Sequence, residues 1–370
     1  MLLVSYQAAV VRVAMVVTRG ALDMVMTPPP AVRYSSPRVA LLPSKLRCRA
    51  PIVCVASSAL EPEEPPEHLR TVDGFYNGAE ALRKTFDEHF ASPRQAHAMR
   101  FVWDYWHVPG QYTLHRTQAA DYFGPEAFEA LTSALTAYGQ RELGCRAISP
   151  PWLSYYIDGC EQAMHADVPQ GPFAYVLSLT RWEERQFEGG ETMLLRPRVL
   201  DFWRGFDSSE GLELGDLFSL TPPLFNQLTV FDARIPHGVR RVDGTRDPRG
   251  GRLVLHGWFT EPSPYFEGGL PEAQIEAGLA DTLGPIFDAI SPPAVTGLLS
   301  VRLRLSAGGD VKELSRLADT LVVDPSQLQA GADADAERGR VVRIIRDGLL
   351  PAKFPTSDEE TLITIPFVFD

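Results

Sequence analysis

The spacing of apolar residues divides the chain into segments with different expected structures. Between residues 61 and 145 helical signals dominate, and apolar side chains recur every three or four positions from Phe128 to Tyr138. The pair Gly124-Pro125 indicates a helix start, because proline is favoured in the first helical turn. We therefore expect residues 61–145 to form a helical flank.

The aromatic residues of this flank gather in the segment 103–117, around the pair Pro109-Gly110. A cluster of this kind is typical of a buried seam between two domains, and we favour that interpretation. The alternative is that these aromatic side chains line a ligand site.

Residues 146–262 have a different pattern, in which short apolar runs alternate with Gly, Pro and Asp. The runs are WLSYYI (152–157), FAYVLSL (173–179), ETMLL (191–195), LTVFD (228–232) and RLVLHGWF (252–259). Several short strands separated by turns are typical of a β-sandwich or β-barrel. We predict a mainly β core here.

The remaining segments are a Pro-rich connector, 263–297, and a small α+β unit, 298–370. The connector contains one predicted helix over 271–289. In the unit, alternation predicts a strand over 299–305, helical spacing predicts a helix over 337–347, and alternation returns in a closing strand over 363–369. Pro366 places that last strand near a sheet edge.

The run LLPAKFPTSDEETLITIPFVF, near the end of the chain, resembles the C-terminal domains of TonB-type energy transducers. The order of elements over 298–370 has the same resemblance. It implies that this unit is an interaction module that binds a protein partner.

The charge distribution separates the N-terminal residues 1–60 from the rest of the chain. They hold seven Lys and Arg residues and one acid, whereas the whole chain of 370 residues holds 35 basic and 47 acidic residues. A basic, acid-poor segment is typical of a transit peptide for a plastid or mitochondrion. The alternatives are a disordered tail, or translation that starts at Met24 or Met26, and then a cytoplasmic location.

The body of the protein is acidic, with a formal charge of −12 for the whole chain. This balance argues against a nucleic acid or an anionic membrane as partner, because both require a clustered positive surface. No stretch approaches the roughly 20 uncharged apolar residues that a membrane span needs. With 45% hydrophobic and 22% charged residues, we expect a soluble globular protein with more than one core.

A candidate metal site begins with His165 and Asp167, which are two positions apart in a β-rich context. Residues at i and i+2 of a strand project from the same face, so these side chains can reach one point. A third ligand must come from a distant strand, and His237, which follows the run LTVFD, is the candidate. Two imidazoles and one carboxylate suit Fe(II), with zinc as an alternative.

Arg252 opens the run RLVLHGWF and shares one face of that strand with Val254, His256 and Trp258. If this face points into the barrel, the buried guanidinium requires an anionic ligand such as a dicarboxylate. His256 is then either a pocket residue or a core histidine. Arg246 and Arg249 are the alternatives to Arg252, but both lie in a Gly/Asp/Pro-rich loop where charges are usually solvated.

Four motifs occur in a fixed order along residues 152–260. They are Tyr155 with nine residues before His165-Ala-Asp167, then Gly189-Gly190-Glu191-Thr192, then Pro236-His237-Gly238-Val239, and then Arg252-LVLHGWF. In this order they resemble the prolyl 4-hydroxylase type of Fe(II)- and 2-oxoglutarate-dependent dioxygenases.

This resemblance implies a double-stranded β-helix (jelly roll) in which His165, Asp167 and His237 hold the iron. It also implies that Arg252 binds the distal carboxylate of 2-oxoglutarate, and that Tyr155 is a second contact to this cosubstrate. His256 and Trp258 would line the same pocket. The other implied cosubstrate is O2, and ascorbate is implied as reductant.

Related halogenases have a small residue in place of the carboxylate, so Asp167 argues for hydroxylation. We therefore expect hydroxylation of an unactivated carbon in a protein, peptide or small-molecule substrate, with a peptidyl proline as the leading candidate. The alternative hypothesis is a non-catalytic β-barrel binding module whose metal site is vacant or structural.

Overall fold

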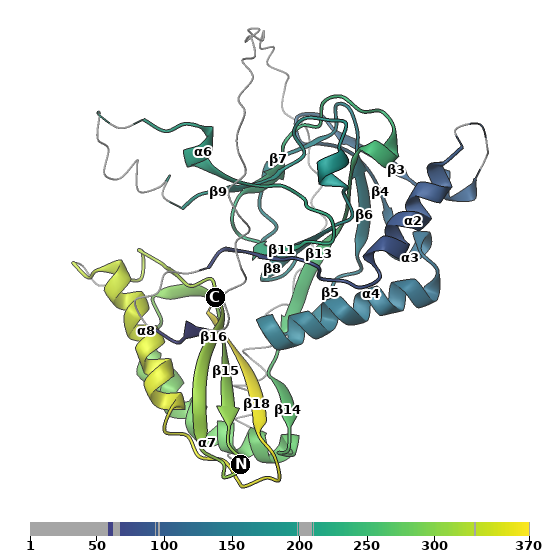
Figure 1. Cartoon of the computed structure of the whole chain (residues 1–370). Coiled ribbons are helices and arrows are strands. Elements are labelled where there is room, and N and C mark those ends of the chain that lie inside the picture. The colour runs from purple at the N-terminus through teal and green to yellow at the C-terminus, as the bar shows by residue number, and fades with distance from the viewer. Residues whose placement is uncertain are drawn as a thin grey trace, which may run out of the picture. The chain divides into compact units, whose positions relative to one another are not determined.

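The apolar runs of residues 146–262 form strands of one curled antiparallel sheet in the computed structural model of the chain (Figure 1). The structure describes residues 58–61, 67–92, 94, 97–197, 199, 209, 211–328 and 331–369. Within these residues, twelve strands belong to this large sheet, in the order β10-β9-β12-β7-β4-β6-β13-β8-β11-β2, with β3 on β4 and β5 on β13. The predicted jelly-roll core is confirmed.

The strands of the large sheet have the following bounds. They are β2 (Leu69–Val72), β3 (Asp104–Val108), β4 (Tyr112–Gln118), β5 (Cys145–Ile148), β6 (Trp152–Tyr156), β7 (Glu161–His165), β8 (Phe173–Ser178), β9 (Thr192–Leu195), β10 (Phe218–Thr221), β11 (Leu228–Asp232), β12 (His237–Val239) and β13 (Arg252–Pro262). Short helices interrupt the connections, namely η3 (Trp182–Glu184), α6 (Leu214–Leu217) and η4 (Pro248–Gly250).

The helical flank contains α2 (Ala79–Phe90), η1 (Ala98–Arg100), α3 (Ala119–Tyr122), α4 (Pro125–Tyr138) and η2 (Gly139–Leu143). Helix α4 begins at Pro125, as predicted, and Gly144 ends η2 with a φ of +66°, a conformation that glycine adopts without steric strain. The segment 61–145 also contributes strands to the large sheet, which the expectation of a helical flank did not include. These strands are β2, which pairs with β11, β4, which pairs with β6 and β7, and β3, which joins the sheet through β4 alone.

The large sheet buries its two faces against different surroundings. On one face, Leu153, Leu177 and Leu255 pack with Phe86 of α2 and Leu131 of α4 in a continuous apolar core. Each such leucine stabilises the fold by about 2 kcal/mol through removal of its side chain from water. The other face encloses a cavity, and the alternation of side chains along each strand assigns them to one side or the other.

A second antiparallel sheet contains β1 (Ser58–Ala59), β16 (Val311–Asp319), β15 (Val295–Leu305), β18 (Thr361–Phe369) and β14 (Tyr265–Gly268) in that order, with β17 (Val322–Val323) on β15. Helices α7 (Glu272–Ile290) and α8 (Ala334–Leu349) share its apolar core. The predicted strand, helix and closing strand of residues 298–370 are present. Both sheets belong to the compact unit that spans residues 57–370.

The interpretation of residues 263–297 as a linker is wrong. This segment contributes β14, α7 and the start of β15, and Ile275, Leu279 and Ile286 of α7 are buried in the core of the second sheet. Its prolines therefore lie within and between the elements of a packed domain.

Pro366 lies on the sheet as its chemistry requires. Strand β14 pairs with β18 only between Thr361 and Thr364, whereas Pro366 pairs with Ser300 of β15. At Pro366 the strand therefore has β15 on one side and no β14 on the other, so a residue without an N–H is accommodated.

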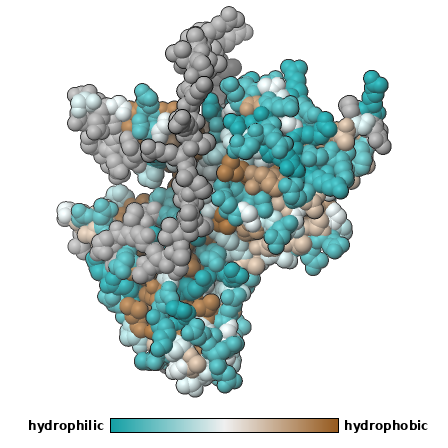
Figure 2. Space-filling model, viewed as in Figure 1, coloured by the Kyte–Doolittle hydropathy of each residue, from teal (hydrophilic) through white to brown (hydrophobic). Residues whose placement is uncertain are grey.

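The predicted targeting segment, residues 1–60, lies almost entirely outside the described residues, and the transit peptide stays a prediction. Its last residues include Ser58–Ala59, which form β1 at the edge of the second sheet. In the described part of the chain, no helix is long and apolar enough to cross a membrane. Hydrophilic residues cover much of the described surface on the face shown in Figure 2, with hydrophobic residues in separate patches.

Candidate functional site

Three side chains from two neighbouring strands converge at one end of the cavity. His165 is the last residue of β7, Asp167 follows two positions later, and His237 is the first residue of β12, paired in register with His165. His237 Nε2 lies 3.2 Å from Asp167 Oδ2, and His165 Nε2 lies 3.6 Å from Asp167 Oδ1. One ligand atom from each residue lies within 4.8 Å of the other two, a spacing that can hold a metal ion.

Backbone carbonyl groups orient both imidazole rings. The His165 Nδ1 lies 2.8 Å from the carbonyl oxygen of Ala163, and the His237 Nδ1 lies 2.8 Å from that of Ile235. Because a carbonyl only accepts, each Nδ1 carries a proton, and each Nε2 is the ring nitrogen directed at Asp167 and the metal position. Metal-binding histidines are commonly oriented by a hydrogen bond of this kind.

Electrostatics favour the protonation states that bind a metal. Burial lowers the pKa of His165, so its imidazole is neutral near pH 7. For Asp167, burial alone would raise the pKa, but the hydrogen bond and charge of His237 lower it overall. The Trp258 Nε1–H also donates to Asp167 Oδ2 at 3.1 Å. Asp167 is therefore an ionised carboxylate with three ring nitrogens within 3.6 Å, those of His237, Trp258 and His165.

Arg252 lies in the same cavity and is 1% exposed. Its Nη2 donates to Thr192 Oγ1 at 3.3 Å, and its Cζ lies 4.6 Å from the centre of the Tyr156 ring. The Arg252 Nε and Nη1 are buried and have no hydrogen-bond partner among the described residues. Burial lowers the pKa of this guanidinium. A buried cation with unpaired N–H groups is a binding group for an anion.

The cavity has a volume of about 250 Å³. Its lining includes the triad, Arg252, Tyr156, Thr192, His256 and Trp258, together with Trp106, Tyr112, Arg116, Trp152, Gln162, Val176, Phe231 and Val254. The face of β13 that Arg252, Val254, His256 and Trp258 share points into the cavity, which meets the condition set for an anion site at Arg252. His256 is thus a cavity residue, and its Nε2 lies 2.8 Å from Ser154 Oγ.

The predicted role of Tyr155 as a cosubstrate contact is wrong. Tyr155 is buried on the opposite face of β6, in the core of the helical flank, where its ring packs against Trp103 at 4.7 Å. Its neighbour Tyr156 faces the cavity. The register explains this, because Arg252 pairs with Tyr156 in the β6–β13 ladder, and residues directly opposite each other share a face.

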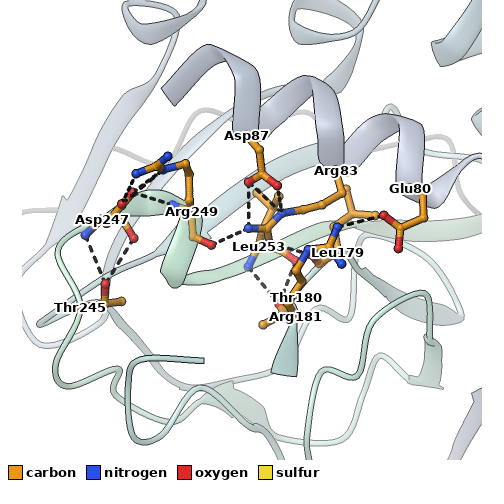
Figure 3. Close-up of polar contacts among 10 residues, drawn as sticks. All are labelled: Glu80, Arg83, Asp87, Leu179, Thr180, Arg181, Thr245, Asp247, Arg249 and Leu253. Atoms are coloured by element: carbon orange, nitrogen blue, oxygen red, sulfur yellow. Dashed lines mark hydrogen bonds and ion pairs between the residues drawn. The ribbon is translucent and has the colours of Figure 1, made fainter. Parts of the chain in front are cut away.

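The alternatives to Arg252 lie away from the cavity. Arg249 forms an ion pair of 2.7 Å with Asp247, and Arg246 is 86% exposed beside Asp158. Figure 3 shows the Arg249–Asp247 pair and the nearby Arg83 of α2, which donates to the carbonyl oxygen of Arg249. Arg83 is buried and also donates to the carbonyl oxygen of Leu179. It therefore anchors the loop that leads into β13 and Arg252.

The aromatic segment 103–117 divides between the two interpretations offered for it. Trp103 packs in the buried cluster of the helical flank, as expected, whereas Trp106, Tyr112 and Arg116 line the cavity. Strands β3 and β4 form a hairpin across Val108 and Tyr112. The ligand-site alternative thus holds for Trp106, Tyr112 and Arg116. The hairpin itself was not predicted, although the turn pair Pro109-Gly110 between aromatic runs is a hairpin signal.

No protein-family model matches the chain, and no curated protein matches it. Solved structures with a similar chain trace include a Pseudomonas putida prolyl-4-hydroxylase, with 15% identity, a TM-score of 0.36, and coverage of 52% of this chain and 92% of that one. A Trichoplax adhaerens prolyl hydroxylase in complex with a hypoxia inducible factor peptide fragment has 15% identity, a TM-score of 0.37, and coverage of 52% and 84%.

A third similar structure is a viral collagen prolyl hydroxylase from Paramecium Bursaria Chlorella virus-1, a 2OG complex, with 13% identity and a TM-score of 0.33. It covers 52% of this chain and 95% of that one. These values are too low to assign a function, which has to rest on the residues of the cavity. The TonB-type resemblance of residues 298–370 is not shown by these comparisons.

Proposed function

We propose that the protein is an Fe(II)- and 2-oxoglutarate-dependent dioxygenase that hydroxylates an unactivated carbon. The observation that carries this proposal is the presence, in one cavity, of a two-histidine, one-carboxylate set and a buried arginine with unpaired N–H groups. The set matches the facial triad of non-haem Fe(II) oxygenases, which leaves coordination positions open.

The residues fit both the metal ion and the cosubstrate. Two imidazoles whose Nδ1 atoms are held by backbone carbonyl groups, with Nε2 directed at the site, and a carboxylate are suitable donors for Fe(II) at His165, His237 and Asp167. The Nε and Nη1 of Arg252 are unpaired, and each lies beside Nη2, which has two N–H groups and donates one to Thr192. Either nitrogen can therefore donate, together with Nη2, two parallel hydrogen bonds to a carboxylate. When bound, iron and 2-oxoglutarate supply the oxidative decarboxylation to succinate and CO2 that is coupled to hydroxylation.

The protein residues have distinct tasks in this proposal. Arg252 holds the distal carboxylate of 2-oxoglutarate, with Thr192 Oγ1 and the Tyr156 ring fixing the plane of the guanidinium. Trp258 orients Asp167 through its indole N–H. Apolar side chains such as Val176, Phe231 and Val254 exclude water from the cavity.

His256 is a neutral member of the cavity wall. Burial and the nearby charge of Arg252 lower its pKa to about 3, so the imidazole adds no positive charge at neutral pH. Its Nε2 is engaged with Ser154 Oγ. In this proposal His256 fixes the position of the cavity wall between Arg252 and the triad.

The proposal includes a peptidyl proline or a small molecule as the hydroxylated substrate, and ascorbate as a reductant that restores Fe(II). Two of the structural neighbours are named as prolyl hydroxylases from Pseudomonas and Trichoplax, and the second contains a peptide. Their low similarity makes this substrate a candidate to be tested with peptides and small molecules in parallel.

The test is succinate formation by the purified protein supplied with Fe(II), 2-oxoglutarate and ascorbate, with and without a substrate mixture. Wild-type protein is expected to form succinate, and Asp167→Ala is expected to form none. If wild-type protein binds iron but consumes no 2-oxoglutarate with any peptide or small molecule, the binding-module hypothesis replaces this proposal.

A further inference from the structure

Arg116 of β4 is a second arginine of the cavity, held between two indole rings. Its Cζ lies 3.3 Å from the centre of the Trp106 ring and 4.2 Å from the centre of the Trp152 ring. All three residues line the cavity. The two rings restrict the plane of the guanidinium, and cation–π contacts of this kind stabilise it without satisfying its N–H groups.

No described residue forms an ion pair with Arg116. Its Nε is buried without a hydrogen-bond partner, and the nearest acid in the ladder is Asp104, which is paired in register with Arg116 on β3. The exposed Asp104 side chain acts on Arg116 only through its charge, because no ion pair within 4 Å joins them. Arg116 thus presents a preorganised cation with N–H groups free to bind a ligand.

The charge count of the cavity leaves Arg116 unbalanced. The charged side chains of the lining are Arg116, Arg252 and Asp167. A divalent metal ion with Asp167 has one net positive charge, Arg252 adds a second, and the 2-oxoglutarate dianion neutralises both. Within the lining the positive charge of Arg116 then has no counterpart, and the acid opposite it, Asp104, is exposed and lies outside the lining.

Aromatic contacts connect Arg116 to the side of the triad that holds His165. The ring of Trp106 stacks on Tyr112 with a centroid distance of 5.0 Å, and Tyr112 meets His165 edge-on at 5.8 Å. Arg116, Trp106, Tyr112 and His165 therefore form one continuous wall. A ligand group bound by Arg116 lies along the wall that ends at the metal site.

We propose that Arg116 binds a carboxylate of the substrate to be hydroxylated, so that the enzyme acts on acidic substrates. This inference rests on the proposed dioxygenase function and specifies its substrate class. Arginine suits the task because its planar fork donates two parallel hydrogen bonds to a carboxylate. The substrate would be a small molecule or a peptide segment whose acidic group points from the reacting carbon toward the β3–β4 hairpin.

The experiment compares N-acetylated amino acids, including N-acetylproline, with their primary amides as uncharged controls. Binding is measured by the change in tryptophan fluorescence of the metal-free protein, since Trp106 and Trp152 flank the site. The same probes are then tested for stimulation of succinate formation. We expect at least one acid to bind wild-type protein about tenfold more tightly than its amide, a ratio that corresponds to about 1.4 kcal/mol.

Three variants separate the role of Arg116 from those of other arginines. Arg116→Gln is expected to abolish the preference for acids and leave the KM for 2-oxoglutarate within about twofold, while Arg116→Lys retains part of the preference. Arg249→Gln, which removes a surface ion pair with Asp247, is the control and is expected to change neither quantity. The comparison of acid binding with amide binding uses wild-type protein alone, so it stays valid even if a variant does not fold.

Several results would overturn the inference. Equal binding of acids and amides, or binding of neither, contradicts it. A KM for 2-oxoglutarate that rises in Arg116→Gln as it does in Arg252→Gln would assign Arg116 to the cosubstrate instead. A preference for N-acetylphosphoserine over every carboxylate probe would overturn the choice of a carboxylate. If the acids bind but no succinate forms under any condition, the dioxygenase proposal fails while the acid-binding site stands.

Discussion

The carbonyl oxygen of Ala233 accepts a hydrogen bond of 2.9 Å from the backbone N–H of Asp167. Two residues further on, the carbonyl oxygen of Ile235 accepts a hydrogen bond from the Nδ1 of His237. One short turn after β11 therefore positions two of the three candidate metal ligands. Contacts that fix the conformation of this turn therefore also fix the positions of these two ligands.

Arg234 connects that turn to the second sheet. It forms an ion pair of 2.7 Å with Asp232, and its guanidinium also donates to Thr296 Oγ1 and to the carbonyl oxygen of Thr320. We predict that Arg234→Ala weakens metal binding by roughly tenfold, a typical loss when a group that supports metal ligands is removed. Titration with Mn(II), followed by electron paramagnetic resonance, measures this affinity without turnover.

The control for Arg234 is Arg241→Ala, which removes an exposed ion pair with Asp243. Thr296→Val, which removes one hydrogen bond from the same network, is expected to have a smaller effect than Arg234→Ala. Arg234→Lys is expected to restore part of the affinity through its ion pair with Asp232. Unchanged Mn(II) affinity in Arg234→Ala would show that the turn holds its conformation without the second sheet.

Arg252→Gln tests the dicarboxylate site. Loss of the buried guanidinium should raise the KM for 2-oxoglutarate by about 100-fold, because a buried ion pair that loses one partner costs roughly 2–5 kcal/mol. Metal affinity should stay close to the wild-type value, since Arg252 makes no contact with the triad that would orient a ligand. An unchanged KM would exclude Arg252 as the cosubstrate arginine.

The neighbouring tyrosines of β6 form a matched pair for a second test of that site. Tyr156→Leu removes the ring under the Arg252 guanidinium and should raise the KM for 2-oxoglutarate by about tenfold, the size of a buried cation–π contact. Tyr155→Leu should instead lower the melting temperature and leave this KM unchanged, because Tyr155 packs against Trp103 on the other face. The opposite pattern would show that the register of β6 is shifted by one residue.

The pH dependence of stability can be predicted for Asp232, which is 2% exposed. Burial alone would raise its pKa, but the hydrogen bonds and the charge of Arg234, with His68 Nδ1 at 3.8 Å, lower it to about 2. A carboxyl with a pKa below that of the unfolded chain, about 3.9, stabilises the fold above that pH and loses its contribution as the pH falls toward 2. The size of this contribution is about 2 kcal/mol at neutral pH.

Urea denaturation of wild-type protein and Asp232→Asn from pH 7 to pH 2 measures this contribution. The difference in unfolding free energy should be largest at pH 5–7 and should shrink below about pH 4. Asp310→Asn, which affects an exposed pair with Lys353, serves as the control and should show a smaller dependence on pH, because water screens the charge that lowers the pKa of Asp310. A difference that stays constant down to pH 2 would mean that Asp232 does not titrate in this range.

Much of the candidate site could be read from the residues alone. His165, Asp167, His237 and Arg252 lie together in the cavity, as their order along the chain predicted. The set of β13 residues that share the face of Arg252 followed from strict alternation, which is a local property of any strand, whereas the direction of that face did not. The closing strand over 363–369 and the helix over 337–347 were also recognised from their own spacing, because each buries one regular face.

The remaining features depend on pairings between residues far apart in the chain, which no local pattern encodes. Tyr156 rather than Tyr155 faces the cavity because β6 pairs with β13 in one register and not in the next. Residues 263–297 became part of a core because apolar positions of α7 found partners on β15 and α8. Arg116 acquired its place between Trp106 and Trp152 only when the β3–β4 hairpin joined β6. Composition and periodicity thus define the candidate ligands and most elements, whereas the folded sheet selects which side chains meet.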